Sequence, residues 1–424
     1  ERAMRSVTGE MGLMRIKSVW GAGVLAALAS LAVLSPGRSL AQESWPQGGF
    51  ATGYAPPAVP LPYPLYSTHP EVGGLFIAGS YTFYNQTNPL RSQEVAVRGF
   101  VTNDDSVLNA AGSAGTFVGS RNNALDVNQV TGPGSFQPGF DLAIGWKFGD
   151  GSSLTADFLW ISETQYTAVA TLAQPIGNGF IRSDQADTFL FSPVFNFPSD
   201  FAGAPNKIVN GTAGPFSVYG IWNGASSMTL AFWQRAQQFT LTYRKPFYET
   251  ECYRASALVG PRFFRIDEKF RWLTTDLDAF GQSAPIFVGV YNNQVTNNMY
   301  GLYTGLQQEW YLGWGVAAML NLNAGMFMDV VRESVDYERG DRDAPENKRT
   351  LRRWRAVPEV QVTPSVMWYP LEGIQMQFAY DIFAFFNTVA SPNPVDFNYS
   401  AINPGYSNVF RLFNGFQATI AFIF

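Results

Sequence analysis

The chain has 424 residues, of which 46% are hydrophobic, 15% aromatic and only 14% charged. An ordinary soluble domain has about 25% charged residues, yet the mean hydropathy of this chain is near neutral at −0.05. A polytopic helical membrane protein is excluded because only one apolar run approaches the length of a membrane span. Abundant aromatic residues and a net charge of −5 exclude a disordered chain. A chain that is apolar on average, but never for long, indicates a β-protein that hides polar groups on one face.

Charge and rare residues narrow the functional classes further. The isoelectric point near 5.1 shows no excess of basic residues, so nucleic acid is not expected as a partner. Cys252 is the single cysteine, which excludes an internal disulfide bond. His69 is the single histidine.

The first 70 residues read as an export segment and a spacer. A basic tetrapeptide begins at Met14, the apolar stretch 21–34 follows, and small residues surround Ala41. This order predicts a signal peptide with an upstream extension over 1–41. Residues 42–70 are dense in proline, which favours an extended chain and predicts a periplasmic linker.

From Leu75 onward, apolar and polar residues alternate with a period of two, which predicts β-strands with one apolar face. The clearest case is 315–333, where alanine, leucine, methionine and valine hold one parity and mostly asparagine, glycine and aspartate the other. Near Pro261 the polar parity changes, which predicts a β-bulge. The ten predicted strands are 74–84, 139–148, 153–166, 227–244, 253–274, 297–311, 315–333, 353–369, 373–387 and 411–424.

The lengths of the connections carry the stronger signal, because short and long ones strictly alternate. A transmembrane barrel has this arrangement, with tight periplasmic turns and long external loops. We therefore predict an all-β, antiparallel up-and-down transmembrane barrel over 71–424 with ten strands, or twelve if 94–102 or part of 167–226 adds a hairpin. The short connections are 149–152, 245–252, 312–314 and 370–372, and the long ones are 85–138, 167–226, 275–296, 334–352 and 388–410.

Aromatic residues gather where each strand would meet a membrane surface, which predicts two girdles. The girdle near the short turns comprises Trp146, Phe148, Tyr243, Tyr253, Trp310, Trp314, Trp368 and Phe422, and that near the long loops comprises Trp160, Tyr166, Tyr300 and Trp354.

Three short motifs resemble a family of bacterial outer-membrane proteins. They are the strand from Trp233 to Tyr243, the run from Gly260 to Glu268 (GPRFFRIDE) and the run from Thr296 to Gly301 (TNNMYG). Together they resemble the seventh of the bacterial beta-barrel porin families, over roughly 74–424. The resemblance implies an outer-membrane barrel with porin-like transport and brings no catalytic residues with it.

The chain ends in alternating aromatic residues, with Phe422 and Phe424 in its last three positions. This ending resembles the signal that the barrel-assembly machinery reads in many barrels. We therefore expect outer-membrane localisation, with outer-membrane lipid and the assembly machinery as partners.

Candidate catalytic and metal sites are poor. Enzymes among such barrels use a histidine as a general base or to activate water. The single histidine here, His69, precedes the first predicted strand, so it cannot belong to a site inside the barrel. A lone cysteine and a lone histidine give no metal-binding spacing. We expect no enzyme activity, no cofactor and no metal.

The informative set is the group of charged residues whose parity turns them toward the lumen. Opposed charges across a narrow lumen can set ion preference. We predict lumen or selectivity roles for Asp141, Asp157, Arg254, Arg262, Glu309, Asp329, Arg353, Arg355, Glu359 and Asp381.

Two functions remain open from the sequence. The first is a porin-like barrel for passive diffusion of small solutes or ions through a charged narrow lumen. The second is a closed structural or adhesive barrel that acts through its long external loops, 85–138 and 167–226. Ten strands lie nearer to the filled eight-stranded barrels than to the water-filled barrels of 16–18 strands.

Overall fold

The computed structural model describes residues 74–101, 116–131, 135–171, 187, 189–197, 205–207, 217–219, 221–250, 252–276, 282–343, 346–371 and 373–424. The predicted signal peptide, the predicted linker and His69 lie outside these residues. The described part is dominated by β-strands, with two single 3-10 turns, η1 (Val127–Val130) and η4 (Pro285–Phe287). In this part of the chain, no helix has the length and apolarity that a membrane crossing requires.

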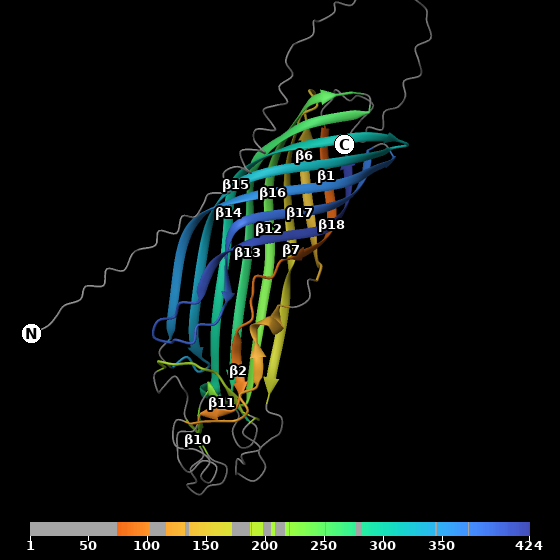
Figure 1. Cartoon of the computed structure of the whole chain (residues 1–424). Coiled ribbons are helices and arrows are strands. Elements are labelled where there is room, and N and C mark those ends of the chain that lie inside the picture. Colours follow the sequence, from red (N-terminus) through yellow and green to blue (C-terminus); the bar gives the residue numbers. More distant parts are fainter. Residues whose placement is uncertain are drawn as a thin grey trace, which may run out of the picture. The chain divides into compact units, whose positions relative to one another are not determined.

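Ten strands form one closed antiparallel barrel in the order β1-β18-β17-β16-β15-β14-β13-β12-β7-β6 (Figure 1). The ring closes because β1 pairs with both β6 and β18. The all-β, ten-stranded barrel predicted from the alternation is therefore confirmed. The strands are β1 (Gly74–Gln86), β6 (Gln137–Lys147), β7 (Ser153–Thr171), β12 (Ser227–Glu249), β13 (Tyr253–Thr275), β14 (Val288–Gly313), β15 (Val316–Arg339), β16 (Asn347–Leu371), β17 (Ile374–Asn393) and β18 (Gly405–Ile423).

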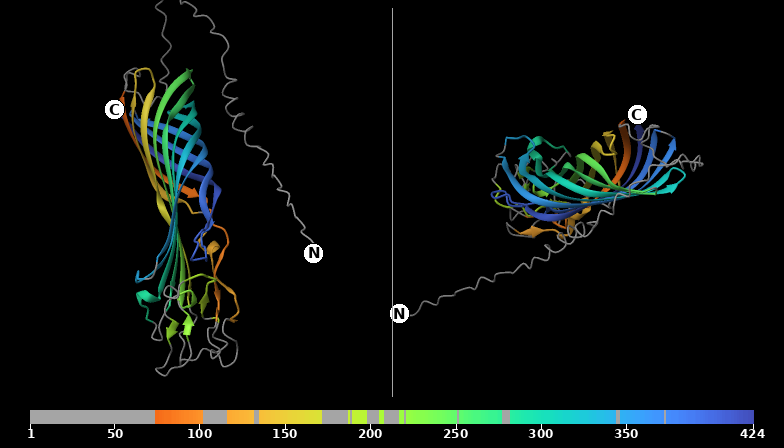
Figure 2. Two further views of the ribbon diagram at one scale, coloured as in Figure 1. Left: turned by 90° about the vertical axis from the view of Figure 1, so that its left-hand side faces the viewer. Right: turned by 90° about the horizontal axis from the view of Figure 1, so that it is seen from above.

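The connections alternate in length as predicted. Tight turns join β6 to β7, β12 to β13, β14 to β15 and β16 to β17, and longer segments join the other pairs. The long connections are shorter than predicted, because the strands continue past the point where their apolar parity breaks. They span 87–136, 172–226, 276–287, 340–346 and 394–404. We call the two ends of the barrel the short-turn end, which holds the C-terminus, and the long-loop end (Figures 1 and 2).

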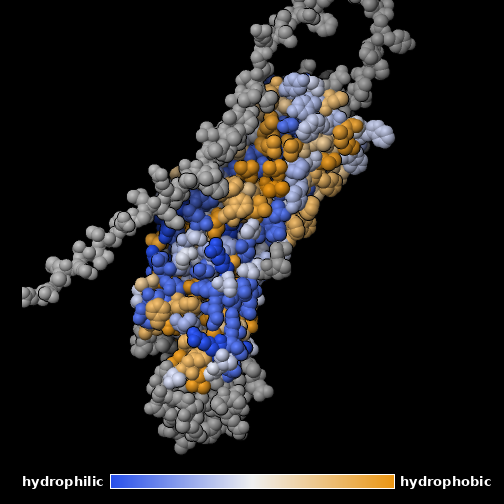
Figure 3. All heavy atoms as spheres, viewed as in Figure 1, coloured by the Kyte–Doolittle hydropathy of each residue, from blue (hydrophilic) through white to orange (hydrophobic). Residues whose placement is uncertain are grey.

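A belt of exposed apolar side chains surrounds the half of the barrel near the short-turn end. Leu142, Leu302 and Phe378 are 55%, 67% and 62% exposed, as a lipid-facing surface requires. Trp146 and Trp368 are exposed near the short turns, and Tyr300 and Trp354 toward the long-loop end, in line with the two predicted girdles. Figure 3 shows that orange surface dominates toward the short-turn end and gives way to blue toward the other end.

The strands β12 to β16 are 23 to 26 residues long and continue well past this belt. About 9–11 tilted residues suffice to cross a membrane. Roughly half of each of these strands therefore projects beyond the belt at the long-loop end, where the chain meets water.

The predicted bulge near Pro261 is wrong, and the reason is instructive. Pro261 pairs with Leu302, and β13 runs beside β14 in one continuous register. The alternation of inward and outward side chains continues unchanged along the strand, but the polar and apolar faces change places. Arg262 and Phe264 both point inward and are buried, while Val259 and Asp267 both face outward. Beyond the belt the outside becomes polar and the inside becomes apolar.

A bulge does occur in β7, where the register against β12 shifts between Gln234 and Ala236. Beyond this shift Tyr166 lies opposite Phe232, whose side chain is buried in the interior. Tyr166 packs against that interior core, so it is not part of the outer girdle as predicted.

The described parts of the two longest connections form a cap against the projecting strands. Their central unit is a four-stranded sheet in the order β11-β8-β2-β5, with β2 (Glu94–Arg98), β5 (Asn123–Asp126), β8 (Leu190–Phe191) and β11 (Asn223–Ala225). The strands within segment 94–102, β2 and the short β3, therefore lie in the cap and do not add a hairpin to the barrel. Two small pairs of strands remain, β3 (Phe100–Val101) with β4 (Phe117–Val118) and β9 (Pro205–Lys207) with β10 (Ser217–Tyr219), and each pair forms a separate two-stranded sheet.

One apolar core joins the cap to the inner face of the barrel. Val95 and Trp222 of the cap pack in the same cluster as Trp272, Tyr291 and Tyr337 of the barrel. The Trp222 and Trp272 rings are 4.6 Å apart between centroids. This burial, at about 25 cal/mol per Å² of apolar surface, fastens the cap to the barrel.

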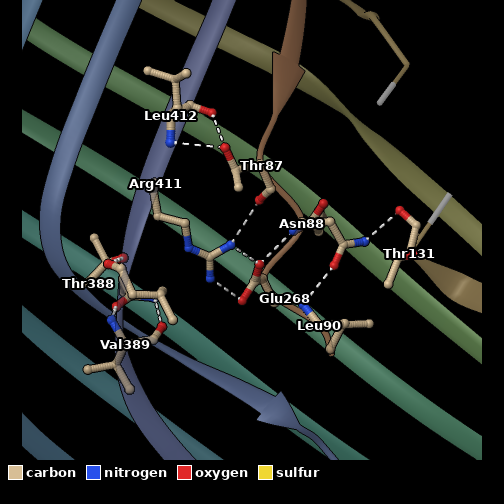
Figure 4. Close-up of polar contacts among 12 residues, drawn as sticks. Thr87, Asn88, Leu90, Thr131, Glu268, Thr388, Val389, Arg411 and Leu412 are labelled. Carbon is tan, nitrogen blue, oxygen red and sulfur yellow. Dashed lines mark hydrogen bonds and ion pairs between the residues drawn. The ribbon is translucent and has the colours of Figure 1, made fainter. Parts of the chain in front are cut away.

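A buried ion pair lies inside the barrel where the cap begins. Arg411 of β18 donates from both terminal guanidinium nitrogens, Nη1 and Nη2, to the carboxylate of Glu268 of β13 at 2.5 Å, and the two side chains are 0% and 4% exposed (Figure 4). Arg411 also donates to the carbonyl of Thr87, the first residue after β1, and Thr87 bonds Leu412. The pair therefore ties the last strand to the opposite wall and to the start of the cap.

Replacing Arg411 tests how much this pair matters. Arg411→Met leaves the Glu268 carboxylate buried without its cation, which costs about 3–5 kcal/mol of unfolding free energy. The double variant Arg411→Met with Glu268→Leu removes both charges and is expected to recover most of that loss. Urea unfolding of the barrel in lipid vesicles measures both values.

Arg342→Met is the matched control. Arg342 is paired with Glu338, but its side chain is 82% exposed, and exposed pairs contribute at most about 1 kcal/mol. An Arg411→Met variant that is no less stable than Arg342→Met would show that the buried pair has no structural role.

Candidate functional site: the barrel interior

All ten charged residues predicted to face the lumen occupy inward positions of their strands. The strict alternation of each strand produces this arrangement, because successive side chains face opposite sides of the sheet. They do not form one cluster. Two lie near the short turns, five lie in the middle of the barrel, and three lie toward the long-loop end.

The central group is organised by one ion pair across the barrel. Arg262 of β13 and Glu359 of β16 are 2.7 Å apart between Nη1 and Oε1, and their side chains are 4% and 1% exposed. The guanidinium also lies 4.1 Å from the ring centroid of Tyr303, a cation–π contact. Glu359 Oε2 has no hydrogen-bond partner among the described residues.

Three further carboxyl groups surround this pair. Asp381 accepts hydrogen bonds from the hydroxyls of Tyr84 and Thr363, both at 2.6 Å. Asp141 accepts from the side-chain amide of Gln417 at 3.0 Å. Asp157 lines the same cavity. The centre of the lumen therefore holds four carboxyl groups and one guanidinium in a dense hydrogen-bond network.

Arg254 and Glu309 lie closer to the short turns. Arg254 is paired with Glu249 at the adjacent turn, and Glu309 lies 3.6 Å from Arg244. Their charges are thus locally compensated by neighbours on the same wall.

Six of the ten predicted residues line a polar cavity of 330 Å³ in the short-turn half of the barrel, namely Asp141, Asp157, Arg254, Arg262, Glu309 and Asp381. It extends from Tyr84 and Asp381 in the middle to Tyr311 and Tyr369 near the short turns. Amide, hydroxyl and charged side chains from every strand contribute, so the cavity suits water or small polar solutes.

Above the cavity, an apolar layer crosses the barrel. We call this layer the septum, and it is built from inward side chains of nine of the ten strands. Phe264, Phe327, Phe385 and Phe413 are at most 1% exposed, and the Phe264 and Phe385 ring centroids are 4.6 Å apart. Rings in contact at this spacing leave no room for a column of water. The septum comprises Tyr84, Leu159, Ile161, Ala236, Phe264, Ile266, Met299, Phe327, Val357, Phe383, Phe385 and Phe413.

The remaining three predicted residues lie on the long-loop side of the septum. Asp329 stands opposite Arg355 in the register of β15 and β16, and Arg353 is 3.3 Å from Glu333. Burial raises the pKa of the Glu333 carboxyl above its ordinary value, while Arg353, Arg349 and Arg355 act in the opposite direction. This group is separated from the cavity by the septum and does not belong to one continuous lumen.

The septum and the Glu268–Arg411 pair were missed from the sequence. In the sequence, most inward positions near the septum are polar, and they are interrupted by Phe264, Phe385 and Phe413. This interruption of the polar set is the signal that marks the septum. The terminal aromatic residues Phe422 and Phe424 lie on the outer face, 49% and 72% exposed. Their role in assembly stays a prediction. Among the described residues, no group of three or more histidine, cysteine or acidic side chains can hold a metal ion.

Neither a protein-family model nor a curated protein sequence matches the chain. The resemblance to a porin family therefore stays a prediction. Solved structures give weak matches that cover most of both chains.

The outer membrane protease OmpT from Escherichia coli shares 11% identity with a TM-score of 0.39, over 83% of this chain and 97% of that one. The P. putida toluene transporter TodX shares 7% with a TM-score of 0.22, over 82% and 89%. A Pseudomonas aeruginosa FadL homologue shares 8% with a TM-score of 0.23, over 83% and 90%. Similarity this low carries no argument about what the chain binds or catalyses.

Single cysteines placed on inward positions can test the division of the interior. In a Cys252→Ser background, Ala143→Cys places a thiol in the cavity lining, and Ala236→Cys places one in the septum, where Ala236 is 1% exposed. A charged methanethiosulfonate reagent is expected to modify the first thiol in the folded barrel and the second only after unfolding. Mass spectrometry measures the modified fraction.

Both substitutions add one sulfur atom to an inward alanine, so each serves as the other's control. Rapid modification of Ala236→Cys in the folded protein would contradict a dry septum.

Proposed function

We propose that the protein is an outer-membrane β-barrel that is closed to free diffusion and presents a folded structure outside the membrane. The observation that carries this proposal is the septum. Nine strands contribute to it, and its phenyl rings are almost fully buried. The cap core lies beyond it on the same inner face. A solute would have to cross two apolar layers.

The outer membrane is the membrane that this architecture fits best. A closed barrel satisfies all backbone hydrogen bonds without a lipid-exposed edge, and the apolar belt supplies the lipid-facing surface. The predicted signal peptide over 1–41 supports export, and the outward aromatic residue Phe422 of the last strand fits assembly by the barrel machinery. On this orientation the short turns face the periplasm and the cap faces outward.

We further propose that the barrel acts through its cap and not by catalysis. The cap gathers the described parts of the two longest connections, 87–136 and 172–226, into a folded unit. The single histidine, His69, precedes the barrel, so a histidine-dependent site cannot assemble from the strands. Adhesion or recognition at the outer surface is the activity that remains for a closed barrel.

Passive diffusion is the second candidate, and the polar cavity favours it. The cavity already occupies the short-turn half of the barrel, so only the septum and cap stand between it and the outside. Porin-like passage of small solutes or ions would require both layers to move aside.

Single-channel recording in a planar bilayer separates the two candidates. The closed barrel is expected to give no conductance steps, although heat-modifiable mobility shows it to be folded and proteolysis shows it to be inserted. Stable, reproducible steps would overturn the closed barrel and support diffusion. In that case Arg254→Glu and Arg355→Glu are expected to shift the selectivity toward cations.

Removing septum rings tests whether this layer is the barrier. Phe264→Ser with Phe385→Ser replaces two touching rings by small hydroxyls and is expected to produce flickering conductance, since water can then enter the layer. The control is Phe386→Ser with Phe410→Ser, an outward pair of rings 5.2 Å apart at the same level. If neither double variant conducts, the barrier lies in the cap and not in the septum.

A further inference from the structure

The outer face of the barrel changes character abruptly above the belt. The register places Phe239, Phe263, Tyr300, Met328 and Ala356 side by side across β12 to β16. This row is the last apolar one. The next four rows toward the long-loop end contain seven basic and two acidic residues, which are Arg235, Arg265, Lys269, Arg271, Arg332, Lys348 and Arg352 against Asp267 and Asp336.

Most of these charges already have partners. Asp267 is 2.9 Å from Arg235 and 3.4 Å from Arg265, and it also accepts from Gln294 and Thr296. These contacts offset its partial burial, so the pKa of the Asp267 carboxyl lies below its ordinary value.

Two other charged residues of the four rows have contacts that are not ion pairs. Asp336 accepts a hydrogen bond from Asn292 at 2.9 Å, and Lys269 lies 5.7 Å from the centre of the Trp233 ring. Glu163 is exposed on the neighbouring strand β7. Even with Glu163 included, basic residues exceed acidic ones on this face by seven to three.

Arg332 and Arg352 are the one pair of basic residues in these rows that face each other across neighbouring strands. They stand directly opposite each other in the register of β15 and β16, and both are exposed. Among the described residues, neither has an acidic side chain within ion-pair distance. Like charges at directly opposed positions destabilise a sheet, so this pair fits a site that an anion completes.

The height of the pair on the barrel indicates where that anion lies. The Arg352 guanidinium lies 5.1 Å from the centre of the Trp354 ring, and Trp354 is 57% exposed in the row just below. Tryptophan marks the membrane–water interface, where lipid headgroups lie. Figure 3 shows apolar surface giving way to hydrophilic surface along the barrel.

We propose that Arg332 and Arg352 bind a phosphate group of an anionic lipid in the outward leaflet. Two guanidinium groups can each bond the phosphate oxygens in bidentate fashion. Trp354 contacts the acyl region next to them, and Arg265 and Lys269 extend the positive surface along the same interface. The site depends on the belt and not on whether the lumen is closed.

Binding of a phosphorylated lipid to the intact protein tests the site. The full chain is refolded in detergent micelles and titrated with fluorescent diphosphorylated lipid A or with its dephosphorylated form. We expect binding of the phosphorylated form to be at least fivefold tighter. Arg332→Gln with Arg352→Gln is expected to weaken it about tenfold or more, since charge-assisted hydrogen bonds are lost.

Arg342→Gln with Lys348→Gln is the matched control. It also removes two positive charges, but further from the belt, where both side chains are exposed and have acidic partners in Glu338 and Glu346. The control is expected to bind the phosphorylated lipid within twofold of the wild type. Circular dichroism and heat-modifiable mobility verify that both double variants are folded.

Three results would overturn the proposal. The first is equal affinity for the two forms of the lipid, and the second is unchanged binding by the Arg332 and Arg352 variant. The third is displacement of the lipid by 10 mM inorganic phosphate, which would make this a site for free phosphate and not for a lipid. None of these results bears on the proposal that the barrel is closed, because conductance is measured separately.

Discussion

The closed ring of hydrogen bonds is the constraint on which the rest of this structure depends. Once ten strands pair without an edge, every side chain must face either the interior or the surroundings. The surroundings change from lipid to water along strands that continue unbroken through both. Each of the long strands β12 to β16 therefore carries two opposite patterns in succession, and the interior must be polar at one end and apolar at the other.

This exchange explains why the barrel has two internal regions and not one pore. Along the belt the outer face is apolar, and Arg262, Glu359 and Asp381 make polar contacts in the interior. Beyond the belt, water accepts outward charges such as Asp267, and Phe264 and Trp272 turn inward. The cap then covers apolar surface that would otherwise face an empty lumen. The Glu268–Arg411 pair lies among these apolar groups, where loss of one partner is costly.

Much of the fold could be predicted from the sequence, because strand parity and connection length are local patterns. The ten strands and the inward position of residues such as Asp141 and Arg355 follow from parity alone. The prediction for the Pro261 region was wrong because it assumed that the outer face of the strand meets lipid along its whole length. The strand leaves the lipid near Pro261, and its outer face then becomes polar. The pairing of Glu268 with Arg411 could not be predicted, because the two residues are 143 positions apart and only the closed ring places them together.

The interior roles were predicted less well for a related reason. Charges with one parity were expected to share one lumen, but the septum separates Asp329, Arg353 and Arg355 from the others. Recognising the septum requires knowing which phenylalanines reach the same height from different strands. That height depends on the stagger of the strands around the ring, which a single sequence does not specify.

The position of β18 has a consequence for the order of folding. The cap is built from connections that follow β1 and β7, early in the chain, while the strand that seals the ring and carries Arg411 comes last. A folded cap of several strands cannot easily enter a ring that is already sealed. The order along the chain therefore allows the cap core to collapse against an open sheet first, with β18 then closing the wall over it. Until that step, the sheet retains two free edges and an exposed apolar face, the features that a chaperone can recognise.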